Sequence, residues 1–230
     1  MCIRDSRRTR HPRNRPAQAH RLRGRPAAEP EHATEAFEVN DALAKAQAAL
    51  AREDYESIEP IVRPLAEAGN SEAQHLLGYL YFTPVEIDKE ESRGWLTRAA
   101  AQNHPQACYW LACMGSEWDF CAPEGEGQCH LLIRSAELGY AQAQRDLGCY
   151  YATGEGGFPL DEKQGRYWYG RAAEQGHVDA QYNYGSMVLL GEGGPKDSEE
   201  GWAWIRRAAA NGDYAAIVHL SQPAGETPLR

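Results

Sequence analysis

The apolar residues of this 230-residue chain recur at the spacing of amphipathic helices. From Ala143 onward, apolar side chains at i, i+4, i+7 and i+8 form one stripe, which is the pattern of a helix packed on one face. A second apolar stretch follows Asp161, a residue type that accepts hydrogen bonds from the first free backbone N–H groups of a helix. Asp88 and Asp197 precede similar stretches. The pattern therefore predicts pairs of short helices, with an aspartate capping each second helix.

This two-helix pattern recurs along the chain with a nearly constant period. The copies align on an alanine, and the gaps between successive alanines are 34, 36, 37 and 36 residues. The five anchors are Ala73, Ala107, Ala143, Ala180 and Ala216. A period in this range is typical of a solenoid, in which each helix pair stacks on its neighbours. We therefore expect an all-α solenoid of stacked antiparallel helix pairs.

Glycines recur at two kinds of position. The tetrapeptide GEGG stands at 154–157 and again at 191–194, but neither copy has the Lys-Ser/Thr pair of a phosphate-binding loop. We interpret both as turns in which glycine supplies a positive φ. Gly78, Gly148 and Gly185 fall inside first helices, where glycine costs roughly 1 kcal/mol against alanine. Their recurrence predicts close backbone contact with the partner helix.

The full pattern resembles the Sel-1-like repeat, a relative of the tetratricopeptide repeat. It reads A-x-x-G-x-x-x-A-Q-x-x-L-G-x-x-Y-x-x-G-x-G, then Asp, then W-Y-x-x-A-A, and the resemblance covers roughly residues 66–220. It is strongest in the third copy, around Ala143. The second copy has Trp118 and Phe120 in place of the turn glycines, so its helices but not its turn are expected to follow the family. The resemblance implies a right-handed solenoid.

The chain divides into four segments by composition and pattern. We expect a disordered Arg/Pro-rich head, an N-terminal capping helix pair, about four repeats with a C-terminal half-repeat, and a disordered tail. These segments are 1–30, 31–69, 70–220 and 221–230. Pro60 and Pro64 should shorten or kink the second helix of the capping pair. The opening letters MCIRDS look like translated sequencing adapter, so a non-native start stays open beside a native basic arm.

Charge narrows the classes of partner and the location. The net charge is −9, but the head holds nine arginines, and the rest of the chain is strongly acidic. An acidic body argues against nucleic-acid binding, which needs a basic stripe.

No apolar run approaches the ~20 residues of a membrane span. The head lacks the apolar region of a secretory signal. The sequence as written fits the cytoplasm, and a missing true N-terminus would leave a periplasmic or secreted location open.

Five cysteines lie in the second and third copies, and three interpretations of them stay open. They are Cys108, Cys113, Cys121, Cys129 and Cys149. Buried free thiols are the preferred interpretation, because Cys113 and Cys149 share a repeat position where a small apolar residue packs. A disulfide in the second copy would require an oxidising compartment. A metal site is disfavoured, since no pair has the C-x₂₋₄-C spacing of zinc ligands.

No catalytic constellation is present in the sequence. It contains neither a G-x-S-x-G elbow nor an H-E-x-x-H motif. Paired glutamates such as Glu90–Glu91 and Glu199–Glu200 stand at predicted helix starts, where their negative charge interacts favourably with the helix dipole. We therefore expect a non-enzyme with no cofactor and no metal.

The function predicted from this pattern is that of a monomeric scaffold or adaptor that binds a protein or peptide on its concave face. Resemblance to tetratricopeptide arrays implies a groove lined by first-helix positions one before, two after and six after the repeated alanine. Those residues are Glu72, His75, Tyr79, Gln106, Tyr109, Cys113, Gln142, Arg145, Asp179 and Tyr182. The tyrosines are the expected anchors. The alternatives are a hydrolase of the cell envelope and a regulatory repeat domain of a longer signalling protein.

Overall fold

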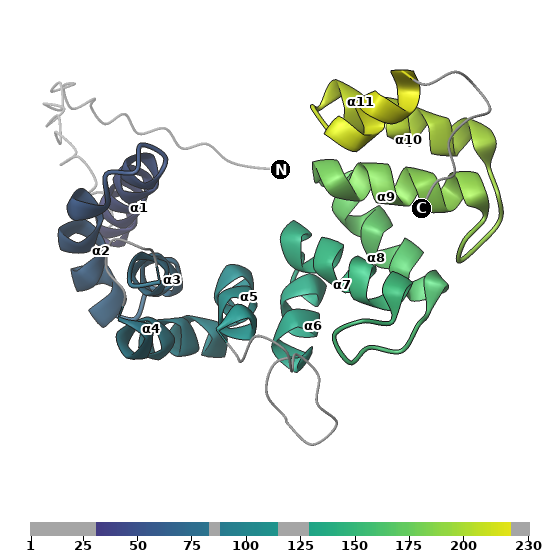
Figure 1. Ribbon diagram of the computed structural model, residues 1–230. Helices are drawn as coiled ribbons and strands as arrows, with labels where there is room; N and C mark the ends of the chain where they lie inside the picture. The colour runs from purple at the N-terminus through teal and green to yellow at the C-terminus, as the bar shows by residue number, and fades with distance from the viewer. Residues whose placement is uncertain (1–30, 83–87, 115–128, 222–230) are drawn as a thin grey trace, which may run out of the picture. The chain divides into compact units, whose positions relative to one another are not determined.

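The structure is a computed structural model that describes residues 31–82, 88–114 and 129–221. Secondary structure in these residues is entirely helical (Figure 1). All packing described below lies within the compact unit that begins at Glu38. The predicted head, the turn of the second copy with Trp118, Phe120 and Cys121, and the tail after Ser221 lie outside the described residues.

The described helices match the predicted pairs. In chain order they are α1 Glu31–Leu50, α2 Ile58–Glu67, α3 Ser71–Leu80, α4 Lys89–Ala101, α5 Pro105–Cys113, α6 Cys129–Glu137, α7 Ala141–Thr153, α8 Glu162–Glu174, α9 Val178–Leu190, α10 Ser198–Ala210 and α11 Tyr214–Ser221, with a 3₁₀ turn at Tyr55–Ser57 before α2. The first helices of the repeats are α3, α5, α7, α9 and α11, and the second helices are α4, α6, α8 and α10. Each helix from α2 to α11 packs on the next one along the chain, as Figure 1 shows for α7 and α8. None of the described helices is long and apolar enough to cross a membrane.

The predicted aspartate caps are present. Asp161 accepts hydrogen bonds from the backbone N–H groups of Lys163 and Gln164 at 3.0 and 3.1 Å. Asp88 and Asp197 cap α4 and α10 in the same way. Side chains also cap first helices, always three residues before the repeated alanine. These caps are Asn70, His104, His177 and Asp213.

The helix glycines lie where the two helices of a repeat touch. A Cβ atom on Gly148 would lie 2.9 Å from the ring of Tyr169 on α8, and one on Gly78 would lie 2.7 Å from Leu96 on α4. Gly185 and Gly201 face each other across α9 and α10 at a similar distance. The expected close contact is confirmed, because only a residue without Cβ allows it.

The GEGG segments are turns, as predicted. Gly154 and Gly191 end α7 and α9 in the left-handed conformation, with φ of 73° and 83°. In the second GEGG segment, residues 191–194, a Cβ atom on Gly193 would lie 2.1 Å from the carbonyl oxygen of Glu162, at the start of α8. Gly154 and Gly191 therefore serve chain reversal, and Gly193 also allows close contact with the preceding repeat.

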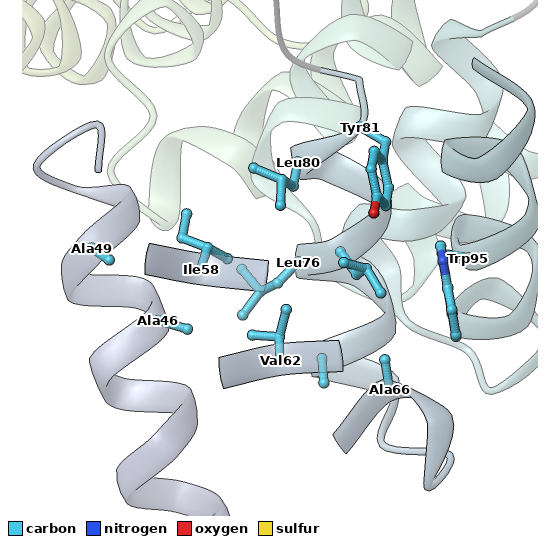
Figure 2. Close-up of a cluster of buried hydrophobic side chains, with 11 residues drawn as sticks. Ala46, Ala49, Ile58, Val62, Ala66, Leu76, Leu80, Tyr81 and Trp95 are labelled. Atoms are coloured by element: carbon cyan, nitrogen blue, oxygen red, sulfur yellow. The ribbon is translucent and has the colours of Figure 1, made fainter. Parts of the chain in front are cut away.

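The N-terminal helix pair shares a core with the first repeat. Figure 2 shows Ala46 and Ala49 of α1 facing Ile58 and Val62 of α2, with Leu76 of α3 beside them. α2 is ten residues long and contains Pro64. The apolar faces of the N-terminal helix pair and of the first repeat are thus buried in one core. A pair that caps a solenoid is expected to pack in this way.

Candidate binding face on the first helices

The residues expected to line a groove lie on α3, α5, α7 and α9. We call them the first-helix face, defined as Glu72, His75, Tyr79, Gln106, Tyr109, Cys113, Gln142, Arg145, Asp179 and Tyr182. Asp179 is exposed, and most of the others are half-buried. His75 is only 8% exposed, so the expectation that every position is exposed is wrong there. The reason is its ring, which stacks on His104 of the next repeat.

Aromatic side chains join the first, second and third repeats along this face. The ring centroids of Tyr79 and Trp110 are 5.1 Å apart. The ring centroids of Trp110 and Tyr109 are 5.4 Å apart, and those of Tyr109 and Tyr140 are 5.2 Å apart in an edge-on arrangement. These spacings are typical of favourable aromatic pairs. Two of the tyrosines predicted as anchors, Tyr79 and Tyr109, therefore belong to one aromatic row, whereas the third, Tyr182, contacts His219 instead.

A single carboxylate, Asp146, joins the second and third repeats. It accepts hydrogen bonds from the hydroxyl of Tyr109 at 2.9 Å and from Nη1 of Arg145 at 2.9 Å. Gln142 donates to the same carboxylate at 3.2 Å. Nη2 of Arg145 reaches on to Asp179 in the fourth repeat at 3.1 Å. Burial raises the pKa of Tyr109, and the neighbouring Asp146 raises it further, so the phenol is a neutral donor.

The N-terminal end of the face is a cluster of titratable groups. Oε2 of Glu72 lies 2.8 Å from Nε2 of His104, and Oε1 accepts a hydrogen bond from Gln47 at 3.0 Å. The hydrogen bond with His104 holds the pKa of Glu72 at about 2. Burial, together with the nearby His104, lowers the pKa of His75 to about 4. At neutral pH this end therefore combines a carboxylate with a neutral buried imidazole.

Sequence reasoning missed several residues that contact the first-helix face. It did not single out His104 or Tyr140, which cap or precede first helices, nor Trp110 and Asp146. The last two share one signal, because each lies three residues after its repeated alanine, directly beside a position that was named. It also missed that Glu72, His75 and His104 bring one ligand atom each to within 4.8 Å of one another. These are residue types that bind metal ions.

The described cysteines divide into two kinds. Cys108, Cys113 and Cys149 are free thiols, as the preferred interpretation expected, and Cys108 is buried. Cys129 is disulfide-bonded, so for that residue the free-thiol interpretation is wrong and the disulfide alternative holds.

Comparison with known proteins agrees with the repeat geometry. The family model described as Sel1 repeat matches residues 71–104, 141–177 and 178–213. It does not match the residues between 104 and 141, where the second copy departs from the pattern. A solved Sel1 repeat protein from Oxalobacter formigenes superposes with a TM-score of 0.64 and 30% identity, over 72% of this chain and 48% of that chain.

Two curated relatives are also similar over 72% of this chain. One is an uncharacterised protein of Neisseria meningitidis serogroup B, 32% identical over 170 residues. The other, 31% identical over 179 residues, is chitin synthase regulatory factor 3 of Schizosaccharomyces pombe. This chain spans 33% of the first relative and 19% of the second.

Proposed function

Because this chain is a Sel1-repeat protein, we propose that it is a non-catalytic adaptor that binds a protein or peptide on the first-helix face. The observation that carries the proposal is the continuity of that face. Side-chain contacts run from Glu72 through the aromatic row and Asp146 to Asp179, and so connect four successive repeats. Extended surfaces of this kind are what helical-repeat proteins use to bind partners.

The composition of the face suits a protein ligand. Interfaces favour tyrosine, tryptophan and arginine, which offer large rigid area and hydrogen bonds together. Tyr79, Tyr109, Trp110 and Tyr182 are all half-buried, so part of each remains available to a ligand. Their intramolecular contacts hold them in place before a partner arrives, which lowers the entropy cost of binding.

The charge of the face favours a basic partner segment. Glu72 and Asp179 place carboxylates on it, and that of Asp146 contacts it, against the single guanidinium of Arg145. The chain as a whole carries a net charge of −9. Complementary charge speeds encounter and selects among partners. We therefore expect a segment with basic and aromatic or aliphatic residues.

The curated relatives support a regulatory setting for such an adaptor. The fission yeast relative is named as a regulatory factor of chitin synthase, and a Malassezia restricta relative, 32% identical over 125 residues, is named as a chitin synthase regulator. Since this chain spans only a small part of either, their target is not carried over. What is carried over is only the kind of role that these names state, which is regulation.

Selection from a displayed peptide library tests the proposal. The full chain is immobilised, and enriched peptides are compared with those recovered on the Tyr182→Ser variant. The matched control is Tyr167→Ser, which makes the same chemical change at an exposed tyrosine on the second helix α8. We expect basic-aromatic peptides to be enriched on the wild type and the control and lost on Tyr182→Ser. Equal enrichment on all three would refute the assignment to this face.

A further inference from the structure

Three side chains converge where the first repeat meets the second. Glu72 and His75 are three residues apart on α3 and so project from one side of that helix. His104 is the N-cap of α5 in the next repeat. Its Nε2 lies 2.8 Å from Oε2 of Glu72, and one ligand atom from each of the three lies within 4.8 Å of the others. Two imidazoles and one carboxylate are a ligand set of zinc sites that keep an open position.

His75 is the member of this cluster that packing alone leaves unexplained. Both of its ring nitrogens are buried without a hydrogen-bond partner, and the residue is only 8% exposed. Buried polar atoms without partners are rare, because each loses its hydration and gains nothing in return.

The equivalent positions two repeats later show which of these residues helix capping alone can explain. There Gln142, Arg145 and His177 replace Glu72, His75 and His104. His177 and His104 act alike, because Nδ1 of each lies 3.4 Å from the backbone N–H of its repeated alanine. Capping therefore accounts for both histidines at this position. It does not account for the pairing of a carboxylate with a second, unpartnered imidazole, which the later repeat lacks.

We propose that Glu72, His75 and His104 form a Zn²⁺ site that joins the first and second repeats. Gln47 holds Oε1 of Glu72 at 3.0 Å, which leaves Oε2 facing His104. When Nε2 of His104 binds the metal, the ring carries its proton on Nδ1, and the long 3.4 Å contact from the N–H of Ala107 is given up. Three protein ligands leave one tetrahedral position for water or for a side chain of a partner. The site does not depend on the proposed adaptor function.

Titration of the chelator-treated full chain with Zn²⁺ tests the site. Calorimetry should show about one equivalent bound, and saturating Zn²⁺ should raise the melting temperature by roughly 3 °C or more, because a ligand of the native state stabilises it. The ligand variants are His75→Phe, which keeps a ring of similar shape, and Glu72→Gln, which keeps the size of the side chain but replaces one carboxylate oxygen by an amide that cannot bind the metal. Each should weaken Zn²⁺ binding at least tenfold and abolish most of the melting shift.

Two controls keep the test decisive. His177→Asn changes the equivalent capping histidine and should leave Zn²⁺ binding within about twofold of the wild type. Without metal, His75→Phe should melt no lower than the wild type, since it removes two unpartnered nitrogens. The proposal is overturned if the wild type binds no Zn²⁺, or if His75→Phe binds Zn²⁺ as tightly as the wild type. The second result would assign the binding to other histidines or to the free thiols.

Discussion

Asn211 donates a hydrogen bond of 2.9 Å from Nδ2 to Oε1 of the buried Gln181, thirty residues earlier. Gln181 in turn donates to the carbonyl oxygen of Ala173, at the end of the preceding repeat. The glutamine of the Ala–Gln pair thus joins three successive helices through one amide. Gln144 and Gln74 make the equivalent contacts with Gln175 and Gln102.

The degraded second repeat lacks this link at both ends. Cys108 stands where the first, third and fourth repeats have the buried glutamine, and Leu138 stands where they have Gln102, Gln175 or Asn211. Losing both polar partners together leaves no unpaired amide, which explains how an apolar pair is tolerated there. The loss coincides with the segment that the Sel1 family model does not match.

Replacing Gln181 by leucine should destabilise the chain. The change removes the hydrogen bonds that Gln181 makes with the amide of Asn211 and the carbonyl of Ala173, and two such bonds at about 0.5–1.5 kcal/mol each give a cost of about 1–3 kcal/mol in the free energy of unfolding. Urea denaturation measures it. Gln164→Leu, at an exposed position on α8, is the control and should stay within about 0.5 kcal/mol of the wild type. A loss at Gln181 no larger than that of the control would show that this amide link does not hold the repeats together.

Gly193→Val should cost at least about 1 kcal/mol of stability. Its φ is 68°, which strains the backbone of a residue with a side chain. A Cβ atom would also lie 2.1 Å from the carbonyl oxygen of Glu162, and this steric clash adds to the loss of stability. Gly94→Ala is the matched control. Gly94 lies in α4, and a Cβ atom added to it would have no neighbour within 4 Å, so alanine there should stabilise by up to roughly 1 kcal/mol. Opposite signs in the two melting curves are expected, and equal signs would contradict the packing described.

Nucleotides should leave the melting temperature unchanged. The GEGG segments lack the lysine and hydroxyl of a phosphate-binding loop, and most of their glycines have a positive φ in chain reversals. ATP or GTP with magnesium is added during thermal melting. A rise that grows with nucleotide concentration would show binding to the native state and would count against the turn interpretation.

Mutations of core residues should cost more free energy of unfolding than mutations of the first-helix face. Leu147 is fully buried, so Leu147→Ala should cost roughly 2–5 kcal/mol by leaving a cavity between α7 and α8. Tyr182→Ser should cost only on the order of 1 kcal/mol, because its side chain is half-buried at the edge of its cluster. Tyr109→Ser should fall between these, since it also removes the hydrogen bond to Asp146. Chemical denaturation of the three variants gives the order, and a Tyr182 variant as unstable as Leu147→Ala would place that tyrosine in the core.

Features set by neighbouring residues were predictable from the sequence. The helix pairs, the aspartate caps, the positive φ of the turn glycines and the close approach at Gly148 all follow from local pattern and repetition. The interior of the binding face was not predictable in the same way. Whether His75 is exposed depends on a ring from the next repeat, and the role of Asp146 depends on Tyr109 reaching it across a repeat boundary. The disulfide of Cys129 was only one of three open interpretations, since spacing alone does not choose among the cysteines.

The affinity of one selected basic-aromatic peptide for Tyr182→Ser, relative to Tyr167→Ser, tests the central claim most directly. Calorimetry or fluorescence anisotropy gives the two dissociation constants, and thermal melting confirms that both variants are folded. If the first-helix face binds the partner, Tyr182→Ser loses at least tenfold in affinity, as expected for an aromatic hot spot, while Tyr167→Ser binds like the wild type. If Tyr182→Ser binds at full strength and Tyr167→Ser does not, the partner uses the second helices and the proposed face is wrong.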